Sequence, residues 1–529
     1  MPSNRYVLKP DVVIEPLVLR WFAWSHLVSP ATACMNIAYR YLPLMESFVT
    51  SPDVHAAACK NPALIGGPFV DLPASSTDEV KQLIDTTKQA SEMILFGEGL
   101  REAFRFLMKS ADGFSIEKFY ALLPESLRGY AELSYTLSGA PDLRVIEPLL
   151  YKKGFHKPEN QSAMMYRVKG DQRTFAFSTP RLKRQDAIEI QKPFDSDVYD
   201  FLATLRTVPR SFDEITQALQ VSEENIELLR SFLTEDTLTA APQTAPGKTR
   251  WRYFGHACVL VESPTGVNVL VDPLIAYEND ETLVRFTLND LPDRLDYVVL
   301  THNHADHVQI ETLLAIRYKV DTIVVPASGG SLVDPSLKLM LESIGFKKVI
   351  ALDVFESITK GDLTLRPMPF LGEHGDLDIR TKAAWLVQSG KDTILFAADS
   401  NNLEPKLYDL IQELYGSVST LFIGMECLGA PFSWVYGAYL PLSVDRKKDQ
   451  TRRLNGSDSD RGMKVIRSLK CESVYIYAMG AEPWLQFVTS IDPSEDTAPA
   501  VNARQLLELC KAEGIKAERL FGSADVTIT

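Results

Sequence analysis

A cluster of histidines constrains this chain more than any other feature of its sequence. Three of the eight histidines, His302, His304 and His307, fall within six residues, directly after the apolar segment 297–300. A loop that leaves a strand can turn the first two histidines to one side and bring Asp306 and the third round to a second position. Imidazoles and a carboxylate on one short loop are ligands that a divalent cation takes. We therefore predict a dinuclear metal site at the end of a buried strand, in preference to a polar surface loop.

From residue 251 onward, short apolar segments alternate with helical patterns. Turn residues separate each segment from the next, as is typical of strands. Many strands with interspersed helices favour an α/β fold in which two sheets stack and helices cover them. The predicted strands are 258–261, 267–271, 297–300, 322–325, 363–368, 384–387, 394–397, 421–425 and 474–477, and the predicted helices are 308–317, 334–345, 404–415, 460–469 and 502–513.

The first half of the chain has no comparable cluster of chemically useful side chains. Apolar residues recur at helical spacing over 78–110 and 115–136, whereas the stretch 162–178 alternates as strands do. These patterns predict a separate mixed α/β domain over residues 1–195.

A small helical module is predicted next, over residues 196–245. Ser211 and Glu214 fit a capping box, and Ser222 precedes a second helical pattern, so the module resembles a winged helix. A DNA-binding role is disfavoured because the segment 222–230 is acidic and the chain carries a net charge of −14. We expect a structural or docking module and no nucleic-acid partner.

The composition of the rest of the chain limits the possible domain boundaries and the possible cellular compartment. The Thr-, Ala- and Pro-rich segment 236–249 predicts a linker before a C-terminal catalytic domain over 246–529. No run of about 18 apolar residues occurs, so we expect no membrane span. The six cysteines are scattered without a C-x-x-C pair, which disfavours a thiolate zinc site or a disulfide framework. A reducing cytoplasm is the expected location.

The pattern His-x-His-x-Asp-His over 302–307 resembles the signature of the metallo-β-lactamase superfamily. The resemblance spans roughly residues 250–529 and includes an aromatic–Gly–His start at 254–256 and the segment 271–273 around Asp272. It implies an αββα sandwich in which Asp272 orients a ligand histidine through its second ring nitrogen. His256 either lines the pocket or is a structural histidine.

Two further pieces match superfamily positions. Asp399 follows a predicted strand where the superfamily has a carboxylate that bridges both metals, and Glu373 and His374 are both available at an earlier ligand position where hydrolases use a histidine. Superfamily hydrolases complete the second metal with a late histidine, but this chain has no histidine after His374. A carboxylate, water, oxygen or substrate must complete it, and the candidate carboxylates are Glu426 and Glu482.

Glu373 and the chain length of about 530 residues give a narrower resemblance, to the di-iron amino acid β-hydroxylases of chloramphenicol biosynthesis. It implies two iron ions, with Glu373 and Asp399 also acting in catalysis. Three imidazoles and three carboxylates favour iron over zinc, because carboxylate-rich dinuclear sites are common in di-iron proteins. The implied metal ligands are His302, His304, Asp306, His307, Glu373 and Asp399.

The resemblance also implies the reaction and the partners. The enzyme would be an O2-dependent monooxygenase of antibiotic biosynthesis, hydroxylating the β-carbon of an amino acid tethered to a carrier domain of a nonribosomal peptide synthetase. Because no flavin or iron–sulfur motif is present, an external reductase is expected. The N-terminal domain would support dimerisation and docking. Trp434 and Trp484, within an aromatic-rich region that also includes Tyr436 and Tyr439, either contact an aromatic substrate or belong to the core.

Two alternatives remain open at the level of the sequence. One is a dinuclear zinc hydrolase, such as a lactonase or phosphodiesterase, that uses a bridging hydroxide. The other is a docking or assembly protein with a degenerate metal fold, which the intact cluster over 302–307 disfavours.

Overall fold

The computed structural model describes residues 4–61, 64, 66–235, 247–491 and 493–528. The linker predicted over 236–249 lies outside the described residues as far as residue 246.

Within the described ranges, two seven-stranded sheets make up the C-terminal half. In order, the first sheet contains β15 (Val349–Leu352), β14 (Val320–Pro326), β13 (Leu295–Val299), β12 (Asn268–Val271), β11 (Val259–Glu262), β10 (Arg250–Tyr253) and β23 (Ala524–Thr527). The second contains β16 (Ile358–Lys360), β17 (Leu363–Met368), β18 (Ala384–Ser389), β19 (Asp392–Phe396), β20 (Thr420–Gly424), β21 (Ser473–Tyr477) and β22 (Lys516–Arg519).

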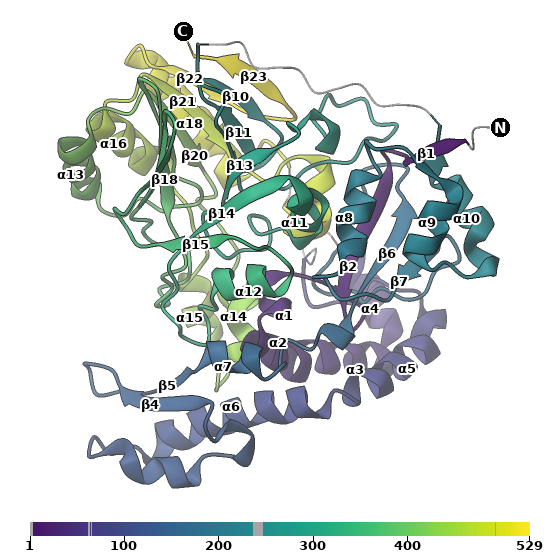
Figure 1. Cartoon of the computed structure of the whole chain (residues 1–529). Helices are drawn as coiled ribbons and strands as arrows, with labels where there is room; N and C mark the ends of the chain where they lie inside the picture. The colour runs from purple at the N-terminus through teal and green to yellow at the C-terminus, as the bar shows by residue number, and fades with distance from the viewer. Residues whose placement is uncertain (1–3, 62–63, 65, 236–246, 492, 529) are drawn as a thin grey trace.

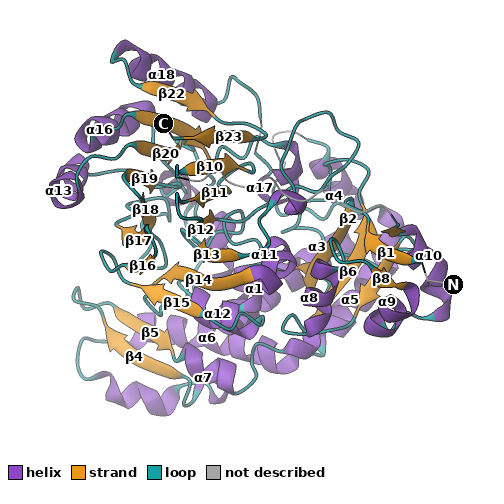
Figure 2. Ribbon diagram, turned by 45° about the horizontal axis from the view of Figure 1, so that its top comes forward, coloured by secondary structure: helices purple, strands orange, loops and turns teal. Residues whose placement is uncertain are grey.

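The two sheets pack face to face, as Figure 2 shows. Buried side chains from both sheets, many of them aromatic, form the core between them. Trp251 of the first sheet lies edge-on to Phe422 of the second, with ring centroids 5.1 Å apart. Helices α13 (Pro405–Tyr415), α16 (Ser459–Leu469) and α18 (Ala498–Ala512) cover the outer face of the second sheet. Helices α11 (Ile310–Ile316) and α12 (Leu337–Ser343) pack on the first. The αββα sandwich and its strands and helices are thus confirmed, with bounds shifted by a few residues.

The N-terminal half has its own four-stranded antiparallel sheet with helices beside it (Figure 1). Its strands are β3 (Trp21–Phe22), β2 (Val12–Val18), β6 (Gln161–Arg167) and β7 (Ala187–Ile190). Its helices are α1 (Ser25–Val28), α2 (Pro30–Asn36), α3 (Leu42–Thr50), α4 (Pro52–Cys59), α5 (Thr77–Lys88), α6 (Ser91–Ser110) and α7 (Glu147–Lys152).

Two predictions in this half were wrong in part. The helical pattern over 115–136 ends in a strand, β4 (Ala131–Tyr135), which forms a hairpin with β5 (Pro141–Val145). Its buried and exposed residues alternate, which is the period of a strand rather than a helix. The strand-like stretch 162–178 contains β6, but Phe175 and Phe177 lie in a loop. Their rings pack against Trp434 of the other half, which accounts for their apolar character.

The helical module contains α8 (Asp197–Thr204), α9 (Phe212–Leu219) and α10 (Ile226–Ser231). The predicted capping box is present, because the Glu214 backbone N–H donates to the Ser211 hydroxyl and the Ser211 N–H donates to the Glu214 carboxylate. Strand β1 (Arg5–Leu8) pairs with β8 (Arg210–Ser211) and β9 (Leu233–Thr234). The module therefore shares a sheet with the start of the chain, and the boundaries at 195 and 245 stay a prediction.

The two halves share one continuous apolar core, which includes residues of α1, α2 and α6 together with α11 and α12. A buried ion-pair network crosses the same interface: Arg173 contacts Glu311 of α11 at 2.7 Å and Glu15 of β2 at 3.2 Å. A large apolar interface of this kind makes two domains behave as one body. No helix in the described part of the chain is long and apolar enough to cross a membrane.

Candidate metal centre

The loop after β13 places the histidine cluster inside the protein. His302 and His307 are completely buried, and His304 is 8% exposed. The backbone N–H groups of His307 and Val308 both donate to the His304 carbonyl, at 3.1 and 2.8 Å. This turn carries Asp306 and His307 round to a position apart from His304, as the sequence predicts.

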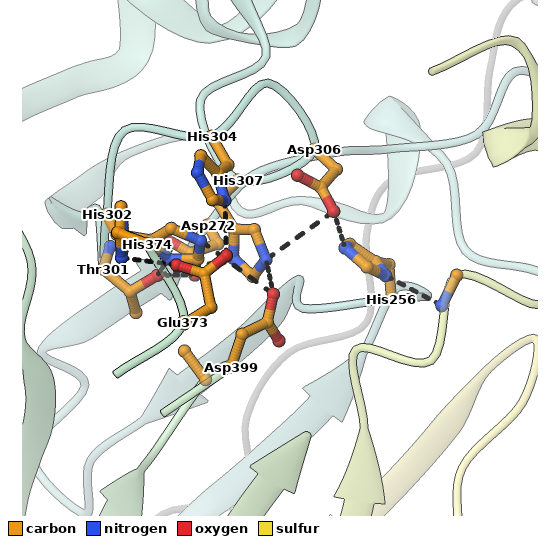
Figure 3. Close-up of polar contacts among 12 residues, drawn as sticks. His256, Asp272, Thr301, His302, His304, Asp306, His307, Glu373, His374 and Asp399 are labelled. Atoms are coloured by element: carbon orange, nitrogen blue, oxygen red, sulfur yellow. Dashed lines mark hydrogen bonds and ion pairs between the residues drawn. The ribbon is translucent and has the colours of Figure 1, made fainter. Parts of the chain in front are cut away.

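Ligand-type atoms converge in three overlapping groups, each within 4.8 Å (Figure 3). One contains His302, His304 and Glu373; a second contains His302, His307 and Asp399; a third contains His256, Asp306 and His307. His304 Nδ1 lies 2.7 Å from Glu373 Oε1. Asp399 Oδ2 lies 3.0 Å from His307 Nε2 and 3.9 Å from His302 Nε2. All six expected ligands therefore meet in one place, with Asp399 between the two histidines.

Unpaired buried atoms indicate that cations fit this centre. In the described part of the chain, His302 Nε2 and Asp399 Oδ1 are buried without a hydrogen-bond partner. Burial, together with the neighbouring His307 and His304, lowers the pKa of His302 well below its usual range, so the ring is neutral with a free lone pair. An orphaned imidazole and an orphaned carboxylate oxygen facing one space are costly unless a cation binds there.

The backbone around the centre adopts conformations that non-glycine residues rarely take. The φ angles are +52° at His256, +39° at Asp272, +70° at Glu373 and +48° at Ala398, which directly precedes Asp399. Left-handed conformations of this kind cost energy and gather at functional sites. A glycine is also required at the end of β20, because a Cβ at Gly424 would lie 2.8 Å from Asp399 Oδ1.

Asp272, at the end of β12, holds His307 from behind. His307 Nδ1 lies 2.8 Å from Asp272 Oδ2, so its N–H donates to that oxygen and Nε2 faces Asp399. Asp272 also accepts from the Thr301 backbone N–H at 2.7 Å and from the Thr301 hydroxyl at 2.6 Å. The geometry is that of a carboxylate that fixes the orientation of a ligand histidine. The sequence did not single out Thr301, although it directly precedes the cluster.

His256 contacts the carboxylate of Asp306, which the turn after His304 positions. The Gly480 N–H donates to His256 Nδ1 at 3.2 Å, so Nε2 carries the proton and donates to Asp306 Oδ2 at 3.1 Å. Glu482 accepts hydrogen bonds from the Tyr253 hydroxyl and from the His256 backbone N–H. His256 is thereby placed to orient Asp306, and Glu482 to support His256.

Two other predicted residues lie close to the centre. His374 Nδ1 lies 2.6 Å from Glu373 Oε2, and its ring stacks on His304 with centroids 4.6 Å apart. Glu373 therefore lies between His304 and His374. Glu426 is half-buried with its Oε2 atom buried, and desolvation together with the nearby Asp399 and Asp306 raises its pKa to about 8. A cation would lower that pKa and favour the ionised form.

The predicted aromatic residues lie in packed surroundings. Trp434, in α14 (Ser433–Tyr436), donates its indole N–H to the Gly66 carbonyl of the N-terminal half at 2.8 Å. Trp484 covers Gly255 and has the Arg285 guanidinium 4.6 Å from its ring. Tyr436, named in the sequence only as part of an aromatic-rich region, has its hydroxyl 3.1 Å from His304 Nε2. No sequence signal pointed to that contact, which joins residues 132 positions apart.

Comparisons with known proteins cover both halves of the chain. Residues 7–237 match the family model described as the diiron non-heme β-hydroxylase N-terminal domain, and residues 267–430 match that of the β-lactamase superfamily domain. A 33% identical metal-dependent hydrolase from Anaeromyxobacter dehalogenans matches only 37% of this chain, over 70% of its own length.

Two relatives align over nearly the whole length. The 4-amino-L-phenylalanyl-[CmlP-peptidyl-carrier-protein] 3-hydroxylase of Streptomyces venezuelae is 34% identical over 98% of both chains. The crystal structure of CmlA, a diiron β-hydroxylase from Streptomyces venezuelae, superposes with a TM-score of 0.91 and 33% identity, covering 99% of this chain and 100% of that one. This chain therefore belongs to the family of non-heme diiron β-hydroxylases, enzymes whose chemistry uses two iron ions and O2.

Proposed function

We propose that this enzyme hydroxylates the β-carbon of an aromatic amino acid held as a thioester on a carrier domain of a nonribosomal peptide synthetase. The full-length similarity to a hydroxylase named for such a substrate supports the proposal. The observation that carries it is the position of Glu373, opposite His304 in a centre that also contains two further carboxylates and two further histidines. That donor set suits a pair of iron ions.

The ligands divide between two cation positions. His302, His304 and Glu373 would hold one iron, and Asp306 and His307 the other, with Asp399 reaching both. Glu426, whose Oε2 is buried without a hydrogen-bond partner among the described residues, is the proposed carboxylate that completes the second position. When bound, the iron pair supplies the activation of O2, which no amino acid side chain performs.

The overall reaction balances with an external reductant. One oxygen atom of O2 enters the Cβ–H bond as a hydroxyl group, and the other leaves as water, which takes up two electrons and two protons. A separate reductase is the proposed electron source. The cytoplasm is the proposed compartment, because the six cysteines are free thiols.

The protein's own residues exclude water and leave one side open. The side chains of His302 and His307 are completely buried, whereas that of Asp306 is 23% exposed. The substrate is proposed to approach from the Asp306 side. Exclusion of water elsewhere strengthens the electrostatic interactions inside the centre and prevents side reactions.

A homodimer through the N-terminal domain is the proposed assembly. Helix α6 and the β4–β5 hairpin project as an arm at the lower left of Figure 1. Several large apolar side chains are exposed on or beside it: Leu95, Met108, Phe114, Leu122 and Leu137. We infer that these side chains contribute to an interface, because exposed apolar surface marks interaction sites. Light scattering after size exclusion should give a dimer, and replacing Phe114, Leu122 and Leu137 by serine should give a monomer; an unchanged mass would contradict this interface.

The proposed reaction is tested with reduced, iron-loaded enzyme and isotopically labelled O2. An aromatic aminoacyl-thioester on a carrier domain should gain one labelled oxygen atom at Cβ, and the free amino acid should not. Hydrolysis of the thioester without O2 uptake would instead indicate hydrolase chemistry. Hydroxylation of the free amino acid at an equal rate would contradict the carrier requirement.

A further inference from the structure

A histidine of the N-terminal domain reaches the segment that supports the metal-binding loop. His26 lies on α1 and is 1% exposed. Its Nδ1 lies 2.9 Å from the hydroxyl of Tyr439, and its ring lies edge-on to that of Tyr436, with ring centroids 6.2 Å apart. The Tyr436 hydroxyl in turn contacts His304, so one buried ring joins the N-terminal domain to the His304 side of the ligand cluster.

The hydrogen bonds around His26 define which nitrogen carries its proton. Asn36 Nδ2 donates to the Tyr439 hydroxyl at 2.9 Å, so that hydroxyl keeps its own hydrogen to donate to His26 Nδ1. Nδ1 of His26 therefore accepts, and Nε2 carries the ring proton. Burial, with contributions from His304 and Arg40, lowers the pKa of His26 to about 3, so the ring stays neutral. The ring is held in one tautomer and one orientation.

The N-terminal domain also grips the segment 434–441, which includes the end of α14 and the 3-10 turn η10 (Gly437–Tyr439). Arg40 donates to the carbonyls of Trp434 and Val435 at 2.8 and 2.7 Å. Arg101 donates to the carbonyl of Ala438 at 2.8 Å. Guanidinium groups on consecutive carbonyls fix the path of a backbone. This segment carries Tyr436, which contacts His304, and Tyr439, which contacts His26.

These contacts act on His304 through Tyr436. The Tyr436 hydroxyl occupies Nε2 of His304, which leaves Nδ1 to face Glu373 at 2.7 Å. His26 packs against the Tyr436 ring and bonds to Tyr439 of the same segment, so it fixes where the Tyr436 hydroxyl lies. We propose that His26 is a positioning residue of the iron centre: through Tyr439 and Tyr436 it holds His304 with Nδ1 toward the metal. This inference rests on the proposed ligand set.

The test is the rate at which iron leaves the His26→Phe variant. Phenylalanine keeps a ring between Trp24 and Tyr439 but cannot accept the hydrogen bond from the Tyr439 hydroxyl. His55→Phe is the matched control, because His55 is 3% exposed and bonded through both ring nitrogens, to Ser47 and Val70 of the same domain. A ferrous chelator should remove iron from His26→Phe about 10–100-fold faster than from the wild type. The control should release iron at the wild-type rate, and the optical spectrum should shift only in His26→Phe.

A second variant separates positioning from general damage to the fold. Tyr439→Phe removes the hydroxyl that donates to His26 and keeps the aromatic ring, so it should speed iron release in the same direction by a smaller factor. Wild-type release rates in both variants would overturn the inference, and so would equal acceleration in the His55 control. Failure of the ligand set itself is distinguishable, because Glu373→Ala would then retain two irons.

Discussion

His304 and His307 lie three positions apart on one loop, but different parts of the molecule hold them. The Nδ1–H of His307 donates to Asp272, which lies at the end of the strand beside β13. His304 depends on Tyr436, 132 residues further along the chain, in a segment that arginines of the N-terminal domain hold. The His307 side is built from neighbouring strands of the sandwich, whereas the His304 side is built at the interface between the two domains.

This difference gives the N-terminal domain a supporting role at the proposed metal centre, in addition to the dimerisation proposed for it. The β-lactamase superfamily domain model matches residues 267–430, which include Asp272 and His307, whereas His26 and Arg40 lie in the separately matched N-terminal domain. Strands of the sandwich therefore support one side of the centre, and contacts between the two domains support the other side. Four substitutions test that division, and their expected effects decrease in the order given.

Glu373→Ala should have the largest effect, because it removes a ligand on the His304 side. We expect fewer than two irons per chain and a fall in hydroxylation beyond the 10–100-fold typical of losing a ligand's supporting partner. Iron analysis and turnover with the carrier-bound substrate measure both. His374→Ala is the neighbouring control and should retain more iron. Loss of iron only in the His374 variant would transfer the ligand role to that residue.

Asp272→Asn should weaken the His307 side. The His307 N–H and both Thr301 donors bond to the negatively charged carboxylate of Asp272, and the asparagine amide is neutral. We expect iron affinity to fall about 10–100-fold, and the unfolding free energy of the iron-free protein to fall by roughly 1–3 kcal/mol. Chelator competition and denaturant unfolding check the two effects. Wild-type affinity in this variant would remove Asp272 from the account.

Tyr436→Phe tests the His304 side with a smaller change. The lost hydrogen bond joins a neutral hydroxyl to an imidazole, and neutral bonds are about half as strong as those to a charged group. Iron affinity should fall by about tenfold or less, with little change in the melting temperature of the iron-free protein. An effect larger than that of Asp272→Asn would reverse the order of importance of the two sides.

Glu147→Gln tests the domain interface away from the centre, where Glu147 of α7 accepts from the Ser336 N–H at 2.9 Å. Burial raises the pKa of Glu147 from 4.5 to about 7. The nearby Asp334 also raises this pKa, and the hydrogen bond from Ser336 opposes the rise. The folded state therefore binds a proton that the unfolded state has lost, and this contribution to stability falls as pH rises from about 4.5 through 7. Relative to wild type, the variant should gain roughly 1–3 kcal/mol between pH 5 and pH 8. Its iron content should not change, and parallel stability profiles would contradict the raised pKa.

The sequence predicted the part of the centre whose residues are positioned by strand ends and by one short turn. A buried strand, a turn and the spacing of His302, His304 and His307 are enough to place these rings together, and Asp272 and Asp399 each follow a strand of the same sandwich. Strand ends in a sandwich meet at one edge, so short motifs far apart in the chain can be brought together by inference.

The other half depends on packing that no short motif encodes. The contact from His26 to Tyr439 joins residues 413 positions apart in different domains, and neither residue lies in a motif of its own. Tyr436 looked like one of several aromatic residues near Trp434, since only the fold shows which ring meets His304. The strand β4 was missed for a related reason, because five residues with alternating burial are too short to outweigh the helical spacing before them.

The most direct test of the account is the metal content of protein purified without oxygen. If the sandwich and the domain interface together hold three histidines and three carboxylates around the metal site, the protein should contain two irons per chain. After reduction, exposure to O2 should then consume O2. Two zinc ions per chain, with no uptake of O2 after iron reconstitution, would contradict it.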